Sequence, residues 1–98
     1  MSFTEQIIQN VWKKGNIIPG NDQDVWRKDQ CGAWIYRDYY GNRNSQYGWE
    51  IDHITPESHG GSDELTNLRP LQWENNVTRQ DGRLSRTVTA SGTNNVHG

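Results

Sequence analysis

The spacing of apolar residues predicts one clear helix near the start of the chain. Over residues 3–14 the apolar side chains recur at helical spacing and form a single stripe: Phe3, Ile7, Ile8, Val11 and Trp12. Ser2 or Thr4 can cap this helix, and Gly15 provides a natural end. We expect the helix to pack its apolar stripe against the rest of the domain.

Further along, the pattern changes to short β-type segments. Residues 33–37 are β-branched and aromatic, and residues 47–54 include an alternation of apolar and polar side chains. These segments predict a β-hairpin whose loop, residues 38–46, is rich in Gly, Asn and Asp. Pro56 ends the second strand, because proline cannot donate a hydrogen bond to the ladder. Residues 22–28 are expected to hold a short helical turn.

The second half of the chain predicts a long loop, a short strand and another helix. The loop covers residues 57–66, the strand covers 68–71, and residues 72–80 have helix composition. Residues 83–98 are polar and lack periodicity, so we expect a flexible tail. The fold class is therefore α+β, with one domain over residues 1–82.

The composition fits a small cytoplasmic domain with an aromatic core. The chain has 98 residues, 31% of them hydrophobic, and includes five Trp and four Tyr. The sequence has no apolar run of membrane-spanning length and no signal-peptide pattern. Cys31 is the only cysteine, which excludes an internal disulfide and favours a reducing compartment. A net charge of −2 does not indicate a protein that binds nucleic acid by charge alone.

The residues with recognisable chemistry lie in one stretch of the second half. Asp52 and His53 end the predicted strand, Asn67 follows the loop, and Asn76 lies nine residues later on the predicted helix. Carboxylate and amide oxygens are ligands for Mg²⁺ or Mn²⁺, and a neutral histidine can take a proton from water. Asn75 competes with Asn76 for the ligand position. Only one of the two can face the metal ion, because adjacent residues point about 100° apart on a helix.

Regular strand geometry argues against a shared site for Asp52 and His53. Adjacent residues of a strand point to opposite faces of the sheet. Because Pro56 follows closely, we expect the strand to kink or end at His53, so that both side chains reach one site.

The segment DHITPESHGGSDELTNLRPLQWENN resembles the HNH endonuclease motif of the ββα-metal fold. The resemblance covers about residues 33–82, with its core at 47–82. It rests on the Asp-His-Ile-x-Pro opening, the Gly-Gly loop, the Asn-Leu-x-x-Leu segment and the asparagine nine residues later. It implies a DNA endonuclease that hydrolyses phosphodiester bonds with one divalent ion, Mg²⁺ or Mn²⁺.

The resemblance also implies a role for each motif residue. His53 falls at the position of the general base, and Asp52 and Asn76 fall at the positions of metal ligands. Asn67 falls where the family ties the long loop to the fold. Arg79 falls near a basic position that could meet the scissile phosphate.

This sequence departs from many family members, which hold a structural zinc with two Cys-x-x-Cys pairs. It has only Cys31, so we expect the aromatic core to take the place of that zinc. Three further arginines are candidates for contacts to DNA: Arg37, Arg43 and Arg69.

Two other functions stay open on the sequence alone. One is a nucleic-acid-binding module of the same fold that has lost catalysis, and the other is a small acidic interaction or inhibitor protein. Between residues 49 and 82 there are seven acidic residues but only two arginines. Binding to DNA would therefore depend on a metal ion, on basic residues of the first half, or on delivery by a partner protein.

Overall fold

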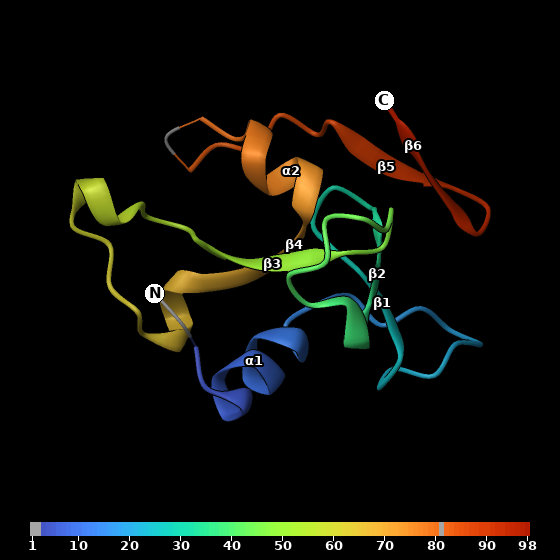
Figure 1. Cartoon of the computed structure of the whole chain (residues 1–98), viewed down its shortest axis with the longest axis horizontal. Helices are drawn as coiled ribbons and strands as arrows, with labels where there is room; N and C mark the ends of the chain where they lie inside the picture. The colour runs from blue at the N-terminus through green and yellow to red at the C-terminus, as the bar shows by residue number, and fades with distance from the viewer. Residues whose placement is uncertain (1–2, 81) are drawn as a thin grey trace.

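A two-stranded antiparallel sheet lies at the centre of the molecule, between two helices. The structure is a computed structural model that describes residues 3–80 and 82–98. Strands β3 (Trp49–His53) and β4 (Leu68–Gln72) form the sheet, with α1 (Glu5–Trp12) on one side and α2 (Trp73–Thr78) on the other (Figure 1). The order β3, β4, α2 gives the ββα arrangement, and the α+β fold class is confirmed.

Helix α1 forms as its apolar spacing predicts. The Thr4 hydroxyl caps it by accepting a hydrogen bond from the Ile7 backbone nitrogen at 3.2 Å. Its buried face packs against the β3–β4 sheet in one core cluster, whose buried members are Ile8, Val11, Trp12, Ile35, Trp49, Ile51 and Leu68.

The strand pairing differs from the predicted hairpin. Strand β2 (Trp34–Tyr36) pairs with β1 (Trp26–Lys28), while β3 pairs with β4. The expected helical turn over 22–28 is also wrong at its end, because β1 begins at Trp26. A tight turn explains the β1–β2 pairing: the Asp29 carboxylate accepts hydrogen bonds from the backbone nitrogens of Cys31 and Ala33, both at 2.9 Å.

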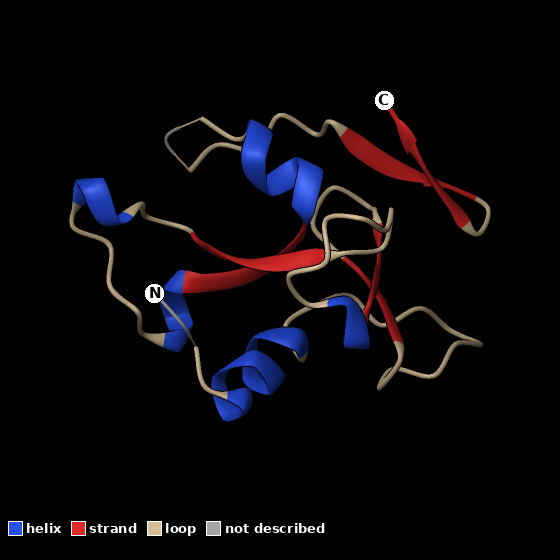
Figure 2. Ribbon diagram, viewed as in Figure 1, coloured by secondary structure: helices blue, strands red, loops and turns tan. Residues whose placement is uncertain are grey.

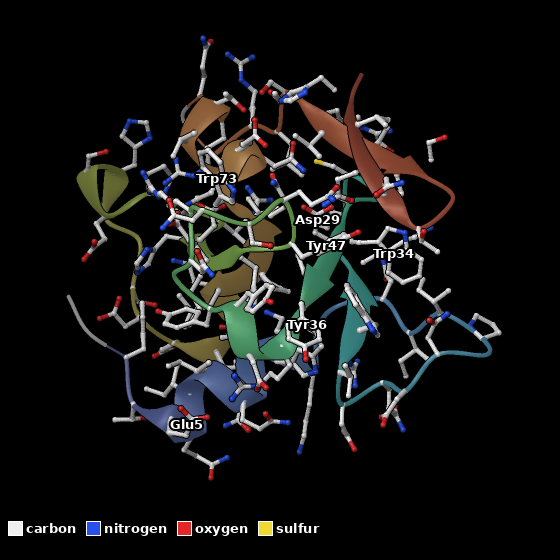
Figure 3. The ribbon with its side chains drawn as sticks, turned by 45° about the vertical axis from the view of Figure 1, so that its right-hand side comes forward. Glu5, Asp29, Trp34, Tyr36, Tyr47 and Trp73 are labelled. Carbon is white, nitrogen blue, oxygen red and sulfur yellow. The ribbon has the colours of Figure 1, made fainter. Side chains whose placement is uncertain are left out.

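Asp29 also belongs to a buried polar cluster that joins this turn to α2. Its other oxygen, Oδ2, accepts hydrogen bonds from the Gln72 backbone nitrogen at 2.9 Å and from Asn75 Nδ2 at 3.0 Å. Asn75 in turn bonds both backbone groups of Val88. Burial raises the pKa of Asp29, and its four N–H donors act in the opposite direction. Asp29 lies in the interior, among the segments that it connects (Figure 3).

Aromatic packing accompanies this polar cluster. The Trp12 and Trp49 rings lie 5.3 Å apart in the core. A second group surrounds Trp26, which contacts the rings of Trp34, Tyr36 and Tyr47. Figure 3 labels the last three of these residues. We expected aromatic packing to stabilise the chain in place of a zinc site; the structure adds buried hydrogen bonds to that packing.

The C-terminal residues form a hairpin where we expected a flexible tail. Strand β5 (Val88–Ser91) pairs with β6 (Asn94–His97), and Val88 is buried. The Asn95 side chain docks the hairpin by bonding both backbone groups of Trp34. These contacts to residues far away in the sequence give order to a segment that has no helical or strand periodicity of its own.

The loop between β3 and β4 contains two short 3-10 helices, η2 (Glu57–His59) and η3 (Leu65–Asn67), and a third, η1 (Arg37–Tyr39), follows β2 (Figure 2). None of the helices in the described residues has the length and apolar character needed to cross a membrane.

Candidate functional site

Asp52 lies in the interior, on the face of the β3–β4 sheet that α2 covers. Its side chain has no exposed surface. Arg69 is its cross-strand neighbour on β4 and donates from Nε to Asp52 Oδ2 at 2.7 Å. Arg79, which follows α2, forms an ion pair with the other oxygen, Oδ1. Asp52 is thus a buried carboxylate between two guanidinium groups.

Asn76 reaches the same place from α2. Its Oδ1 accepts a hydrogen bond from Arg79 Nε at 3.3 Å, and its Nδ2 donates to Glu50 at 2.8 Å. Asn75 faces Asp29 and Val88 instead. Of the two candidate asparagines, Asn76 is therefore the one directed toward Asp52.

One oxygen of the buried Asp52 carboxylate has no hydrogen bond within the described residues. The cause is geometric: Arg79 Nε has a single hydrogen, and its hydrogen bond goes to Asn76 Oδ1. Asp52 Oδ1 consequently receives positive charge but no proton. Asp52 Oδ1 and Asn76 Oδ1 both lie next to Arg79 Nε. A carboxylate oxygen and an amide oxygen are ligands that bind Mg²⁺ or Mn²⁺. Asp52 and Asn76 fit such an ion, at the position that Arg79 Nε fills.

Glu50 adds a second carboxylate on the same face of β3. It accepts from Arg43 Nε at 2.6 Å and from Asn76 Nδ2. Burial raises its pKa, but the hydrogen bonds from Arg43 and Asn76 outweigh this effect, so the pKa of Glu50 lies below its usual value. Glu50 is therefore negatively charged at neutral pH, and its charge is paired with the Arg43 guanidinium.

His53 lies on the opposite face of the sheet. The β3–β4 register continues without interruption to the His53–Leu68 pair, so the expected kink is absent and the alternation of faces holds. The His53 ring faces the segment that precedes α1, with the Phe3 ring 6.1 Å away. Asp52 and His53 therefore end the same strand but do not share one pocket.

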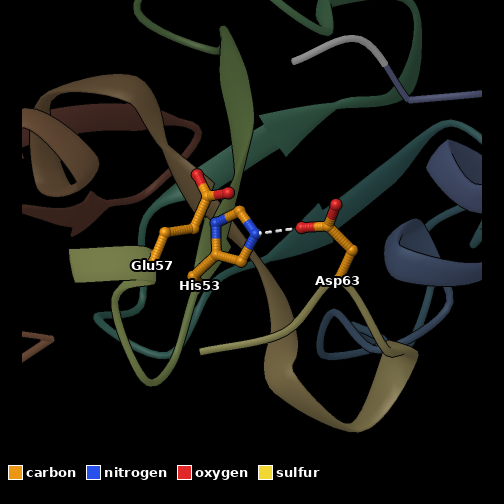
Figure 4. A group of neighbouring side chains, drawn as sticks. All are labelled: His53, Glu57 and Asp63. Carbon is orange, nitrogen blue, oxygen red and sulfur yellow. Dashed lines mark hydrogen bonds and ion pairs between the residues drawn. The ribbon is translucent and has the colours of Figure 1, made fainter. Parts of the chain in front are cut away.

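Two loop carboxylates surround the His53 imidazole. Its Nε2 bonds Asp63 Oδ1 at 2.6 Å, and one ligand atom from each of His53, Glu57 and Asp63 lies within 4.8 Å of the others. Glu57 and Asp63 lie toward different ring nitrogens (Figure 4). The group could hold a cation, but a metal ion binds only one ring nitrogen, so this arrangement suits orientation of the imidazole better than chelation. With Asp63 accepting from Nε2, Nδ1 has the lone pair that a base needs.

Asn67 closes the β3–β4 loop at its base. Its Oδ1 accepts from the Thr55 backbone nitrogen at 2.8 Å, and its Nδ2 donates to the backbone oxygens of Thr55 at 3.1 Å and Ser62 at 2.7 Å. Gly61 is required here, because a Cβ atom at this position would lie 1.7 Å from the Thr55 oxygen. We call this arrangement of Asn67, Thr55, Ser62 and Gly61 the loop clamp.

Comparison with known families agrees with the arrangement of these residues. Residues 39–80 match the HNH endonuclease family. The matched segment contains β3, β4, α2 and the loop clamp, so the resemblance recognised in the sequence is confirmed. No curated protein matches the chain, and no solved structure does.

Within the HNH segment, the loop clamp gives a first prediction. Asn67→Ala should lower the free energy of unfolding by about 1–3 kcal/mol, because it leaves three backbone groups without their partner. Asn67→Asp should be as harmful, since a carboxylate would face the two carbonyl oxygens that Nδ2 now bonds. Urea denaturation followed by tryptophan fluorescence measures both. Unchanged stability with lost activity would instead place Asn67 in the chemistry.

Three arginines were expected to contact DNA, and the structure places them differently. Arg69 is buried and donates to Asp52, Gln30 and the Gly82 backbone oxygen, so it supports the interior of the site. Arg37 pairs with Glu5 on the α1 side, and Arg43 pairs with Glu50. Arg43 is the most exposed of the three, with 55% of its side-chain surface accessible.

Proposed function

We propose that this protein is a metal-dependent endonuclease that hydrolyses phosphodiester bonds of DNA. The observation behind the proposal is that oxygens of Asp52 and Asn76 converge on one cationic group, at the end of the strand that also presents His53. The HNH match of residues 39–80 supports a nuclease or nucleic-acid-related function for this segment.

The placement of His53 and Asp52 on opposite faces of β3 suits an in-line displacement. In such a reaction the attacking water and the departing oxygen lie on opposite sides of phosphorus. In the described residues β3 pairs with β4 along one edge, and on its other edge only Trp49 forms a bridge, with Tyr40. A phosphodiester at that outer edge, near the end of β3, would have His53 toward one side and Asp52 toward the other.

Each residue then has a defined task. Asp63 holds the His53 ring through Nε2, and His53 Nδ1 takes a proton from the attacking water. Asp52 and Asn76 would hold a Mg²⁺ or Mn²⁺ ion, which when bound supplies positive charge to the departing oxygen. Arg69 stabilises the Asp52 carboxylate from β4, and the loop clamp fixes the segment that holds Asp63.

A plasmid-cleavage assay with Mg²⁺, Mn²⁺, Zn²⁺ or EDTA tests the proposal. We expect cleavage with Mg²⁺ or Mn²⁺ and none with EDTA. The circular dichroism spectrum should be unchanged by EDTA, because the α1 core and the Asp29 cluster do not involve Asp52 or Asn76.

Variants of Asn76 provide the matched pair for this assay. Asn76→Ala should lower the rate and be rescued in part by excess Mg²⁺, since water can replace a neutral ligand, while Asn76→Asp should keep activity at lower metal concentration. Cleavage that resists EDTA would refute the proposal. DNA binding without cleavage would favour the inactive module, and absence of both would favour the interaction protein.

A further inference from the structure

The guanidinium group of Arg79 lies where the oxygens of Asp52 and Asn76 converge. We propose that Arg79 occupies the cation position in the free domain and leaves it when a DNA phosphate arrives, so that metal loading is coupled to substrate binding. This inference rests on the proposed function, because it concerns the same metal position. It assigns to Arg79 a gating role in addition to a contact with phosphate.

The charges around Asp52 support a competition between Arg79 and a metal ion. One carboxylate faces two guanidinium groups, those of Arg69 and Arg79, so the group as a whole is positively charged. A divalent cation entering beside both arginines would be repelled. Once Arg79 leaves, Asp52 and Arg69 form a neutral pair, and Glu50 beside Asn76 forms a second neutral pair with Arg43, so the net positive charge that repels a cation is gone.

The two arginines differ in their ability to move. Arg69 lies on β4, is 10% exposed, and has three hydrogen-bond acceptors that hold it in place. Arg79 is 25% exposed and lies just beyond α2, where the backbone is already extended. Its departure would not leave Asp52 unpaired, because Arg69 remains. Arg79 is therefore the arginine that can exchange its partner at low cost.

The contact that Arg79 makes in the free domain is also incomplete. Its Nε directs its single hydrogen to Asn76 Oδ1, and Asp52 Oδ1 has no hydrogen bond in the described part of the chain. A phosphate offers a guanidinium group two parallel hydrogen bonds, which is the geometry that arginine prefers. A divalent ion prefers to complete its coordination with substrate oxygens. When a phosphate is present, the move of Arg79 from Asp52 to the phosphate and the binding of the ion at Asp52 and Asn76 therefore favour each other.

Metal binding without DNA tests the gate directly. Mn²⁺ affinity of the full chain is measured by electron paramagnetic resonance for wild type and for Arg79→Gln. We expect the variant to bind Mn²⁺ about tenfold tighter or more, in the range of ordinary coupling between sites. Arg83→Gln removes the same charge from an exposed position and should change the affinity little. Arg79→Met repeats the test if the glutamine variant does not fold.

Double variants show where the additional Mn²⁺ affinity arises. The gain in affinity should disappear in Arg79→Gln/Asn76→Ala, because Asn76 is a proposed ligand of the ion. It should persist in Arg79→Gln/Glu57→Gln, because Glu57 belongs to the His53 group. Arg79→Lys, which keeps the charge, should show little gain. A short DNA duplex should tighten Mn²⁺ binding in wild type more than in Arg79→Gln.

Two results would overturn the proposal: Mn²⁺ affinity that is the same in wild type and Arg79→Gln, or a gain that survives the loss of Asn76. Because the measurement needs no cleavage, its outcome is separate from that of the nuclease assay. Tighter Mn²⁺ binding in a variant of a protein that never cuts DNA would refute the nuclease function and leave the competition at Asp52 standing.

Discussion

His53→Ala is expected to reduce DNA cleavage by about 10²–10⁴-fold, the usual contribution of a positioned general base. The His53 ring contacts Phe3 and Asp63 at the end of β3, and it is not a member of the buried core cluster. The variant should therefore keep the circular dichroism spectrum of wild type. Single-turnover cleavage rates at saturating Mg²⁺ measure the effect.

Two comparisons distinguish a general-base role of His53 from a role as a metal ligand. Asp63→Asn should lower the rate less than His53→Ala, because the ring loses its orientation but keeps its lone pair. Mn²⁺ affinity should be unchanged in His53→Ala if the ion binds at Asp52 and Asn76. A folded His53→Ala protein with near wild-type cleavage would rule out the base, and a loss of Mn²⁺ binding would move the metal to the His53, Glu57 and Asp63 group.

The largest effect on stability is expected from Asp29→Asn. The two Asp29 oxygens accept four hydrogen bonds, from the backbone nitrogens of Cys31, Ala33 and Gln72 and from Asn75 Nδ2. Asparagine has only one acceptor oxygen, so its amide nitrogen would face two N–H donors. Each unsatisfied buried donor costs about 1–3 kcal/mol, and we expect a total loss of about 2–5 kcal/mol.

Urea denaturation followed by tryptophan fluorescence measures this loss. Asp38→Asn, at an exposed position, is the matched control and should change the free energy of unfolding by less than about 0.5 kcal/mol. A stability close to that of wild type in Asp29→Asn would mean that bonds to a single oxygen suffice to hold the β1–β2 turn against α2.

The contrast between Asn76 and Asp29 indicates what the sequence can reveal about this protein. Helical periodicity and motif spacing are local properties, and they were enough to predict α1 and α2 and to favour Asn76 over Asn75. The role of Asp29 depends instead on contacts between residues that are distant in the sequence. Its bonds to Gln72 and Asn75 cross 43 and 46 positions, and a buried aspartate cannot be told from an ordinary turn aspartate by its neighbours in sequence.

The environment of Asp52 depended on strand pairing in the same way. Arg69 is its partner only because β3 pairs with β4, whereas the sequence favoured pairing with residues 33–37. Once that register is known, the Asp52–Arg69 pair follows from cross-strand geometry. The His53–Asp63 contact needs in addition the path of the loop, which periodicity does not describe.

The loop clamp fixes the base of the β3–β4 loop, so the positions of the two strands do not depend on the length of that loop. Thr55 and Ser62 are held together at the base, while Gly60 lies beyond them with open space where a Cβ atom would stand. Lengthening a closed loop at its tip changes its entropy only slowly with residue number. We therefore expect a peptide inserted at the Gly60 tip, such as a tag or a recognition element, to leave Asp52 and Asn76 in their positions.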